Sequence, residues 1–301
     1  MHPGRMSGAR GIVSDRRSEL ADFLRGRRTR AAPLPGGGFT GKRRRTPGLR
    51  REELAQLAGL SVDWYTRLEQ GRDVNPSRET LEAIARVLKL DEDERGHLFY
   101  LARPEPAGGT ARSPARQERA EPAMTRALEA MRVPALVFSP RFDVLAWNGA
   151  ACRLLVDFGD VPSRKRNLLW MTFHHAGYRA CYADIGVIER EAVASFRFSA
   201  SSYVGDPEFD ALIAGLLETN EAFRALWARH EVRAKVSGIK AFRIEGRGAG
   251  DRDAGGGPLV LEWHTLASTT SSRQQLVYYT TRSAGGPEDE RRLAALCEDA
   301  G

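Results

Sequence analysis

Residues 51–71 read REELAQLAGLSVDWYTRLEQG, two short apolar runs at helical spacing with a break between them. The first run stops at Ala58-Gly59, and the second begins behind Ser61 and stops at Gly71. Glycine adopts the left-handed conformation that ends many helices, and a serine side chain accepts hydrogen bonds from the free amides that begin one. The stretch therefore predicts two helices joined by a turn of three or four residues, the geometry of a helix-turn-helix.

The two predicted helices should each have an inner and an outer face. The inner face is predicted from the apolar residues at helical spacing, which are Leu54, Leu57, Tyr65 and Leu68. A helix that enters the major groove reads bases mainly with its N-terminal part. The residues predicted to contact DNA from that part of the second helix are Ser61, Val62, Asp63, Thr66 and Arg67. Gln56, on the first helix, is predicted to bond a phosphate.

Positive charge is concentrated at the N-terminal end of the chain. Residues 1–51 contain 14 Lys and Arg against 3 Asp and Glu, whereas residues 104–301 contain 25 of each kind. A neutral body with one basic end predicts a polyanionic partner for that end alone. Arg43, Arg44 and Arg45 belong to a basic run ahead of the motif. They are predicted to contact phosphates or the minor groove, with a solvated loop as the alternative.

The chain divides at residues 104–122, which are rich in Pro, Gly, Ala and charge and lack apolar periodicity. We predict an all-α DNA-binding domain over residues 1–103, a linker over 104–122, an α+β domain over 123–282 and a tail over 283–301. Residues 287–301 of that tail could form a short helix. Within the second domain, two strand-like runs precede a block of helical stretches, and three strand-like runs follow. That order predicts an antiparallel sheet covered by helices.

Two sets of motifs resemble known families. ELAQLAGLSVDWYTRLEQGR, followed by NPSRETLEAIARVLKL, resembles the helix-turn-helix domain of the Xre/Cro family of bacterial repressors. Over the wider chain, LDEDERGHLFYLA, PALVFSPRFDVLAWNGAA, LWARHEV and the late LEWHTL and LVYYT are similar to the MmyB-like regulators. That second resemblance implies a helix-turn-helix domain followed by a PAS-like ligand-binding domain. It also implies an acyl-chain ligand, which composition and spacing do not indicate.

The second domain lacks phosphate-binding glycine motifs and a nucleophile-elbow motif, so we predict a non-enzyme with no cofactor and no metal. Its aromatic residues are the better guide, because helices packed over a concave sheet can enclose a ligand cavity. The predicted lining is Trp147, Phe173, Trp263 and Tyr279, with His264, Arg197 or Tyr203 as contacts for a polar head group. Strand alternation puts Trp263 and His264 on opposite faces of the sheet.

These observations favour a cytoplasmic, nucleoid-associated regulator that binds a double-stranded DNA operator and senses a small apolar, fatty-acid-like ligand. We expect a homodimer on an inverted repeat, since one motif reads only a short half-site. The linker is expected to leave the DNA-binding domains mobile until they meet DNA. One alternative is a regulator whose second domain binds a partner protein, and another is an enzyme fused to a DNA-binding module. No apolar run approaches the roughly 20 residues of a membrane span, so no membrane partner is expected.

Overall fold

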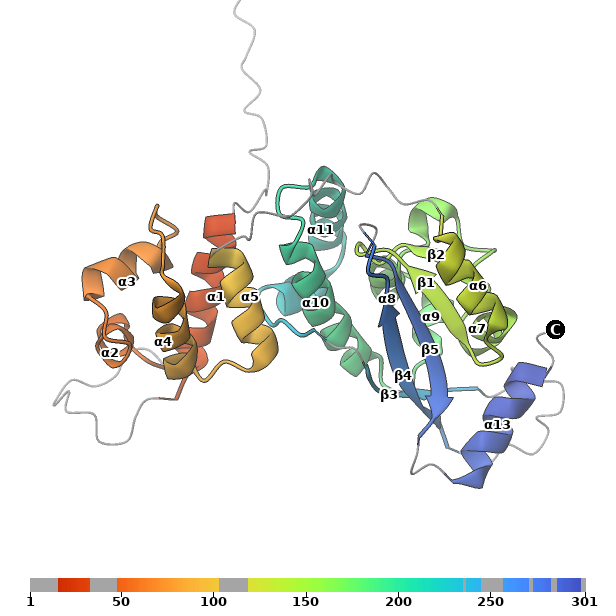
Figure 1. The fold of residues 1–301 in the computed structure, drawn as a ribbon. Coiled ribbons are helices and arrows are strands. Elements are labelled where there is room, and N and C mark those ends of the chain that lie inside the picture. The colour runs from red at the N-terminus through yellow and green to blue at the C-terminus, as the bar shows by residue number, and fades with distance from the viewer. Residues whose placement is uncertain are drawn as a thin grey trace, which may run out of the picture.

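The computed structural model describes residues 16–32, 48–102, 119–234, 237–244, 257–270, 273–282 and 286–298. These residues form two units that lie side by side, an all-helical one and one that contains a sheet (Figure 1). The helical unit comes first along the chain, as predicted. The predicted DNA contacts Arg43, Arg44 and Arg45 lie outside the described residues.

The described part of the N-terminal unit is a bundle of helices around one apolar core. Its helices are α1 (Arg16–Arg30), α2 (Arg51–Leu57), α3 (Val62–Glu69), α4 (Arg78–Leu88) and α5 (Glu92–Ala102). Fully buried members of the core include Leu24, Leu54, Tyr65 and Leu81. Burial of each such aliphatic side chain contributes about 1.5–3 kcal/mol, so packing rather than helix propensity holds these short helices.

Side chains cap the starts of α3, α4 and α5. Ser61 Oγ accepts a hydrogen bond from Trp64 N at 3.1 Å, and Ser77 Oγ accepts one from Thr80 N at 3.2 Å. The carboxylate of Asp91 caps the start of α5 in the same way. Each cap satisfies an amide that has no partner within its helix and stabilises the helix by about 1 kcal/mol.

Leu57 is wrongly predicted to point inward. Its side chain is 45% exposed, whereas Leu54 and Ala55 of the same helix are fully buried. Successive helical residues are about 100° apart, so a face centred between Leu54 and Ala55 leaves Leu57 about 110° from that centre. Leu60, which follows the turn, packs against the core of the unit.

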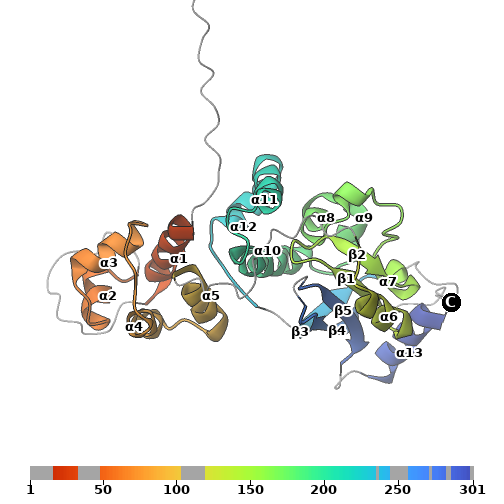
Figure 2. The same ribbon diagram turned by 45° about the horizontal axis from the view of Figure 1, so that its top comes forward.

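The C-terminal unit is built on an antiparallel sheet with the strand order β2-β1-β5-β4-β3 among the described residues (Figure 2). The strands are β1 (Ala135–Phe138), β2 (Val144–Trp147), β3 (Ser237–Phe242), β4 (Leu259–Ala267) and β5 (Gln275–Thr281). The β1–β2 hairpin forms one edge, and the late strand β5 pairs with β1 in the middle of the sheet. Trp263 and Tyr279 are directly opposite each other in the β4–β5 ladder, so they point to the same face.

Helices cover that face of the sheet. They are α7 (Gly149–Leu154), α8 (Leu168–His174), α9 (Ala176–Ala180), α10 (Ile185–Ser201), α11 (Pro207–Thr219) and α12 (Glu221–Trp227), with a 3-10 turn, η1 (Ser163–Lys165). The main core of the unit lies between these helices and the sheet and includes Phe138, Tyr182, Phe196 and Leu261. The long helix α10 runs between the sheet unit and the N-terminal unit, in contact with α8 and with α5 (Figure 2).

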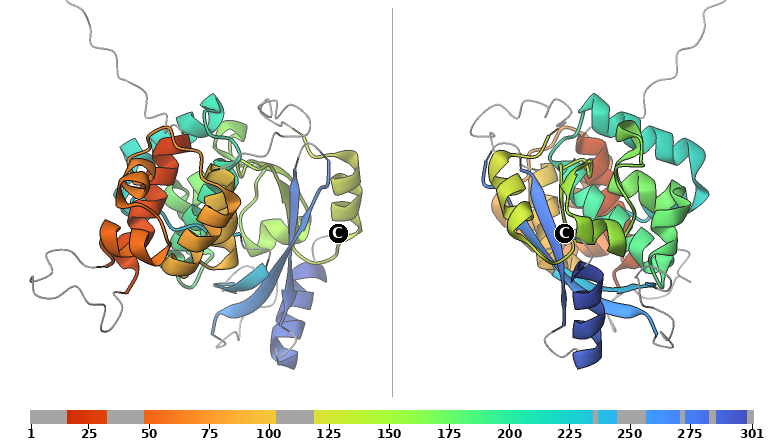
Figure 3. Two further views of the ribbon diagram at one scale, coloured as in Figure 1. Left: turned by 60° about the vertical axis from the view of Figure 1, so that its left-hand side comes forward. Right: turned by 90° about the vertical axis from the view of Figure 1, so that its right-hand side faces the viewer.

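Two further helices complete the unit. Helix α6 (Pro122–Ala130) covers part of the opposite sheet face (Figure 3), where Leu128 and Leu276 belong to a small buried apolar cluster. Helix α13 (Pro287–Glu298) packs against α7, β4 and β5, and its Leu293 joins the main core. The residues of α13, predicted as part of a tail, therefore contribute to the core.

The predicted fold class is confirmed: an all-α unit is followed by an antiparallel sheet covered by helices. Helix α11 ends at Asn220, whose side chain begins the next helix by accepting a hydrogen bond from Phe223 N at 2.9 Å. Among the described residues, every helix is too short or too polar to cross a membrane.

Candidate nucleic-acid interface and ligand pocket

The turn between α2 and α3 is closed by two backbone hydrogen bonds. Leu60 N donates to Ala55 O at 2.8 Å, and Gly59 N donates to Gln56 O at 3.2 Å. This pair of bonds is the Schellman arrangement, and it uses the positive φ of 69° at Gly59. A glycine takes that conformation without strain, so the turn fixes the angle at which α3 leaves α2.

The DNA contacts predicted on α2 and α3 lie at the surface. Gln56, Ser61, Val62, Asp63 and Arg67 are exposed and Thr66 is half-buried. Asp63 and Arg67 are four residues apart, so they lie one turn from each other on the same face of α3. Val62 is 41% exposed at the start of the helix, which is a large fraction for an apolar side chain. At about 100° per residue, Val62, Asp63, Thr66 and Arg67 lie within about 140° of one another around α3, and they form one surface, called the α3 face.

A buried ion network that sequence reasoning missed holds α3 in place. The Glu69 side chain is fully buried at the end of α3. Arg28 of α1 donates from Nε to Oε2 at 2.7 Å and from Nη2 to Oε1 at 2.8 Å, and Arg51 of α2 donates from Nε to Oε1 at 2.9 Å. Because the network joins three helices, it fixes the orientation of the α3 face.

The network also sets the charge of Glu69. Burial by itself raises the pKa of this carboxyl, but the hydrogen bonds from Arg28 and the charges of Arg28 and Arg51 outweigh it and hold the pKa below its ordinary value. The carboxylate is therefore ionised near neutral pH. A bidentate arginine–carboxylate pair of this kind is the strongest common form of charged hydrogen bond.

The α3 face lies away from the C-terminal unit. The N-terminal unit contacts that unit through α1 and α5, whereas α2 and α3 lie at its far end (Figures 1 and 2). Because α3 lies at that far end and Val62, Asp63 and Arg67 are exposed, DNA can approach the α3 face without displacing the sheet unit.

Replacing Arg67 with alanine is expected to weaken operator binding by about 1–3 kcal/mol and to relax base preference at one position. The reason is that a guanidinium on a helix in the major groove can donate two hydrogen bonds to guanine O6 and N7. Competition between operator and random duplexes in a filter or anisotropy assay measures both effects. Equal weakening on the two duplexes would show that Arg67 contacts only a phosphate.

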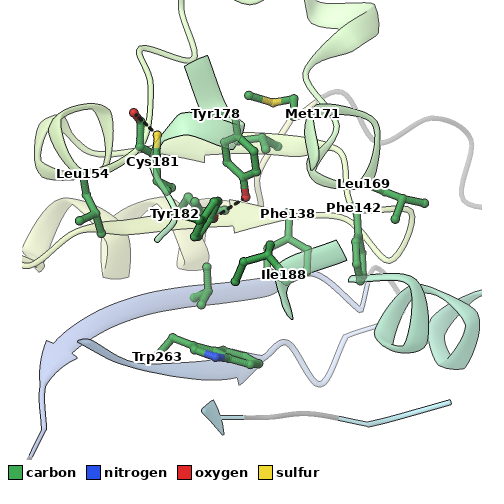
Figure 4. Close-up of a cluster of buried hydrophobic side chains, with 14 of the residues drawn as sticks. Phe138, Phe142, Leu154, Leu169, Met171, Tyr178, Cys181, Tyr182, Ile188 and Trp263 are labelled. Carbon is green, nitrogen blue, oxygen red and sulfur yellow. Dashed lines mark hydrogen bonds between the residues drawn. The ribbon is translucent and has the colours of Figure 1, made fainter. Parts of the chain in front are cut away.

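A cavity of about 100 Å³ lies between the sheet and the helices that cover it. Trp263 of β4 and Tyr279 of β5 form part of one wall, and Thr172 of α8, Tyr178 of α9 and Ile188 of α10 belong to the opposite side. Figure 4 shows Trp263 on the sheet side and Ile188 and Tyr178 on the helix side of this region. The walls are mainly aromatic and aliphatic, as in most small-molecule sites.

Of the four aromatic residues predicted to line a ligand cavity, two lie in the wall of this cavity. Trp263 and Tyr279 line it, whereas Trp147 and Phe173 do not. Trp147, on the edge strand β2, packs against Phe158. Phe173 packs edge-to-face against Phe223 of α12. Phe173 follows Thr172 on α8, and neighbouring helical residues point about 100° apart, so only one of the two faces the cavity.

None of the three predicted head-group contacts lines this cavity. His264 lies on the other sheet face, stacked on Tyr278, as strand alternation predicts. Arg197 and Tyr203 line a different cavity, of about 70 Å³, beside the N-terminal unit. The polar wall residues that the prediction missed include Glu191 and Ser195 of α10 and Lys240 of β3. Lys240 Nζ lies 5.1 Å from the centroid of the Trp263 ring.

Two polar groups around the cavity, those of Thr172 and Tyr178, take part in structural hydrogen bonds, whereas Nε1 of Trp263 is buried without a hydrogen bond to any described residue. Thr172 Oγ1 donates to Leu168 O at 2.8 Å, and Tyr182 Oη donates to Tyr178 Oη at 2.8 Å. Burial raises the pKa of both tyrosines, so their phenols stay protonated at neutral pH. Within the described residues, no three His, Cys, Asp or Glu side chains gather closely enough to hold a metal ion.

Comparison with family models gives two matches. Residues 19–98 match a helix-turn-helix domain, and residues 120–296 match the MmyB-like transcription regulator ligand binding domain. No curated protein matches the chain. The first match contains the α3 face and the second contains the cavity, and the second alone covers more than half of the chain. With a helix-turn-helix joined to a ligand-binding unit, the chain is a transcription regulator with a ligand-sensing domain, and it belongs to the MmyB-like family.

Proposed function

We propose that this regulator reads a double-stranded operator through the α3 face and that its C-terminal unit senses an apolar, fatty-acid-like molecule. The observation that carries the ligand assignment is the cavity between the sheet and α10, with its aromatic and aliphatic walls. Both matched families are domains of regulators rather than of enzymes, which supports a binding role for this cavity.

The walls of the cavity favour a ligand with an apolar body, and they carry one cation, Lys240, and one carboxylate, Glu191. Each methylene removed from water contributes about 0.8 kcal/mol, so an acyl chain of ten or more carbons binds tightly with one polar anchor. Lys240 is our candidate for that anchor, because its Nζ lies over the ring of Trp263 and 5.9 Å from the centroid of Tyr279. Hydrogen bonds between an ammonium and a carboxylate are about twice as strong as neutral ones.

On DNA, the chemistry of the α3 face suits the major groove. Arg67 offers paired donors for guanine, Asp63 can accept from cytosine N4, and Thr66 can contact a thymine methyl group. Gln56 and the basic run of residues 43–45 are proposed to bind phosphates, which would position the helix without reading sequence. This division between base contacts and phosphate contacts predicts a DNA operator with a short base-specific core.

We further infer a homodimer on an inverted repeat, acting on chromosomal DNA in the cytoplasm. One helix-turn-helix contacts a single short half-site, and two-fold dimers of such units read half-sites about 34 Å apart on one side of the duplex. A symmetric dimer therefore supplies the specificity that one α3 face lacks.

The ligand assignment is tested by extraction and by a chain-length series. Mass spectrometry of denatured, freshly purified protein is expected to find acyl material, and calorimetric titration with saturated carboxylates of eight to twelve carbons should give a Kd that falls about 4-fold per methylene. Decylamine, which matches decanoate in length but carries a positive head, should bind more weakly. An extract without acyl material, together with a Kd that does not change with chain length, would contradict the ligand assignment and favour the alternative in which the second domain binds a partner protein.

A further inference from the structure

The cavity is small for the ligand that the function requires. An engineered apolar cavity of about 150 Å³ binds benzene, so a volume of about 100 Å³ cannot enclose a chain of ten carbons. Methylenes left in water gain no burial energy. A long-chain ligand therefore binds fully only if the elements that cover the cavity move, and α10 supplies several residues of that cover.

Helix α10 has two functional faces. Ile188, Ala192 and Ser195 line the cavity at intervals of three and four residues, so they share one face. At about 100° per residue, Ala194 and Arg197 point to the other side of the helix. That other side faces the N-terminal unit, which α10 contacts through α5.

Arg197 anchors the second face. Its side chain is 3% exposed, and its Nη1 lies 3.1 Å from Glu19 Oε2 of α1 in the N-terminal unit. The guanidinium also stacks on the Trp227 ring, 3.7 Å from the ring centroid, and donates to the Trp227 carbonyl. Burial lowers the pKa of Arg197 to about 10, which still leaves it charged at neutral pH. A buried charge of this kind needs its partner, so the Arg197–Glu19 pair holds the two units in register.

The segment after α12 forms a second attachment beside the first. Val232 is 5% exposed and belongs to the apolar core of the N-terminal unit. The neighbouring Arg233 N donates to Ala194 O of α10 at 3.2 Å, and Arg27 of α1 donates to His230 O at 3.4 Å. Residues 228–234 therefore connect the N-terminal unit directly to α10.

Helix α10 also has space on both sides. The ligand cavity lies on one side, and the cavity of about 70 Å³ that Glu19, His97 and Arg197 line lies on the other. A helix between two voids can shift without first compressing a close-packed core. Since the α3 face is not covered by the C-terminal unit, such a shift acts by turning the N-terminal unit rather than by uncovering it.

We propose that Arg197 is the positioning residue through which an occupant of the cavity sets the orientation of the N-terminal unit. The ligand separates α10 from the sheet, α10 carries Arg197 and residues 228–234 with it, and the α3 face turns relative to its partner in the dimer. This inference rests on the proposed function, because it assumes that a ligand enters the cavity. The coupling between ligand and DNA then depends on the buried ion pair of Arg197 and Glu19, two residues that are 178 positions apart in the sequence.

The test compares Arg197→Met with wild type and with Arg126→Met, an exposed arginine of α6 that serves as the matched control. Decanoate binding is measured by calorimetry, and operator Kd is measured with and without saturating decanoate on a duplex selected from a random library with the full chain. We expect decanoate to change the wild-type and Arg126→Met operator Kd by at least about 5-fold. Arg197→Met should bind decanoate as wild type does, yet show less than about a 2-fold change. A full response in Arg197→Met overturns the proposal.

A second arm does not depend on the identity of the ligand. Ala192→Leu adds bulk to the cavity from α10 itself, and Ala192→Val is the smaller step if circular dichroism shows that the leucine variant is unfolded. Either change should raise amide exchange in residues 228–234 by at least about 10-fold and shift the operator Kd. If decanoate does not bind the wild-type protein, the ligand assignment fails, and the Ala192 variants alone test the relay through Arg197. Unchanged exchange and unchanged Kd overturn the relay through Arg197.

Discussion

Replacing Glu69 with glutamine is expected to destabilise α1, α2 and α3 by about 3 kcal/mol, the lower end of the range for breaking a buried ion pair. The fully buried carboxylate accepts three hydrogen bonds from Arg28 and Arg51. Glutamine leaves these two cations without a counter-charge, and Arg28 is only 11% exposed. Arg51 is 38% exposed and can turn to solvent, which limits the loss. Hydrogen exchange of peptides from the three helices measures it.

The same substitution should change how the unit responds to acid. The pKa of Glu69 is lower in the folded protein than in the unfolded chain, where a glutamate has a pKa of about 4.3. Its contribution is therefore fully present above that pH and is lost as the pH falls through the lowered pKa. Glu69→Gln should lose this part of the acid sensitivity. The control Glu52→Gln, an exposed position on α2, should cost less than about 1 kcal/mol. Equal costs for the two variants would contradict the structural role given to Glu69.

Inserting five base pairs between the two half-sites of the operator is expected to weaken binding by about 100-fold, to the level of a single half-site. Five base pairs are about half a helical turn, so the insertion moves one half-site to the opposite side of the duplex. The N-terminal unit is attached to the C-terminal unit by the Arg197–Glu19 pair and by Val232, and this attachment prevents each α3 face from following its half-site.

The matched control carries the same five base pairs outside the half-sites, where they should have no effect. A duplex with one half-site scrambled gives the level of single-site binding, and sedimentation of the saturated complex counts the chains. Binding that tolerates the internal insertion would show that the DNA-binding units swing freely, as the linker suggested from the sequence. A single chain on the operator at saturation would contradict the homodimer.

Local signals in the sequence explain why so much of the fold could be predicted. Ser61 accepts a hydrogen bond from the amide three positions further on, and Gly59 closes the turn between the two helices. These interactions are complete within a few residues, so a short stretch of sequence contains them. Leu57 shows the limit of periodicity. Its spacing of three residues from Leu54 is compatible with a shared inner face, but so short a helix does not show where that face is centred.

The contacts that could not be predicted join residues far apart in the chain. Arg28 and Glu69 are 41 positions apart, and the Arg27–His230 hydrogen bond joins the two units across 203. Nothing local to Glu69 marks it as the buried centre of a network. The pocket shows the same limit: alternation gives the sheet face of Trp263, but it cannot say that Trp147, on an edge strand, faces Phe158 instead.

Occupancy of the cavity beside α10 is expected to change how the α3 face binds DNA. The most direct measurement is the Kd of the full chain for one operator duplex, with and without decanoate at a concentration that calorimetry shows to be saturating. The two Kd values should differ by about 5- to 150-fold, the usual range for coupling between two sites. Equal values, with decanoate demonstrably bound, would contradict this expectation, since a ligand that does not distinguish two states of a protein cannot shift their balance.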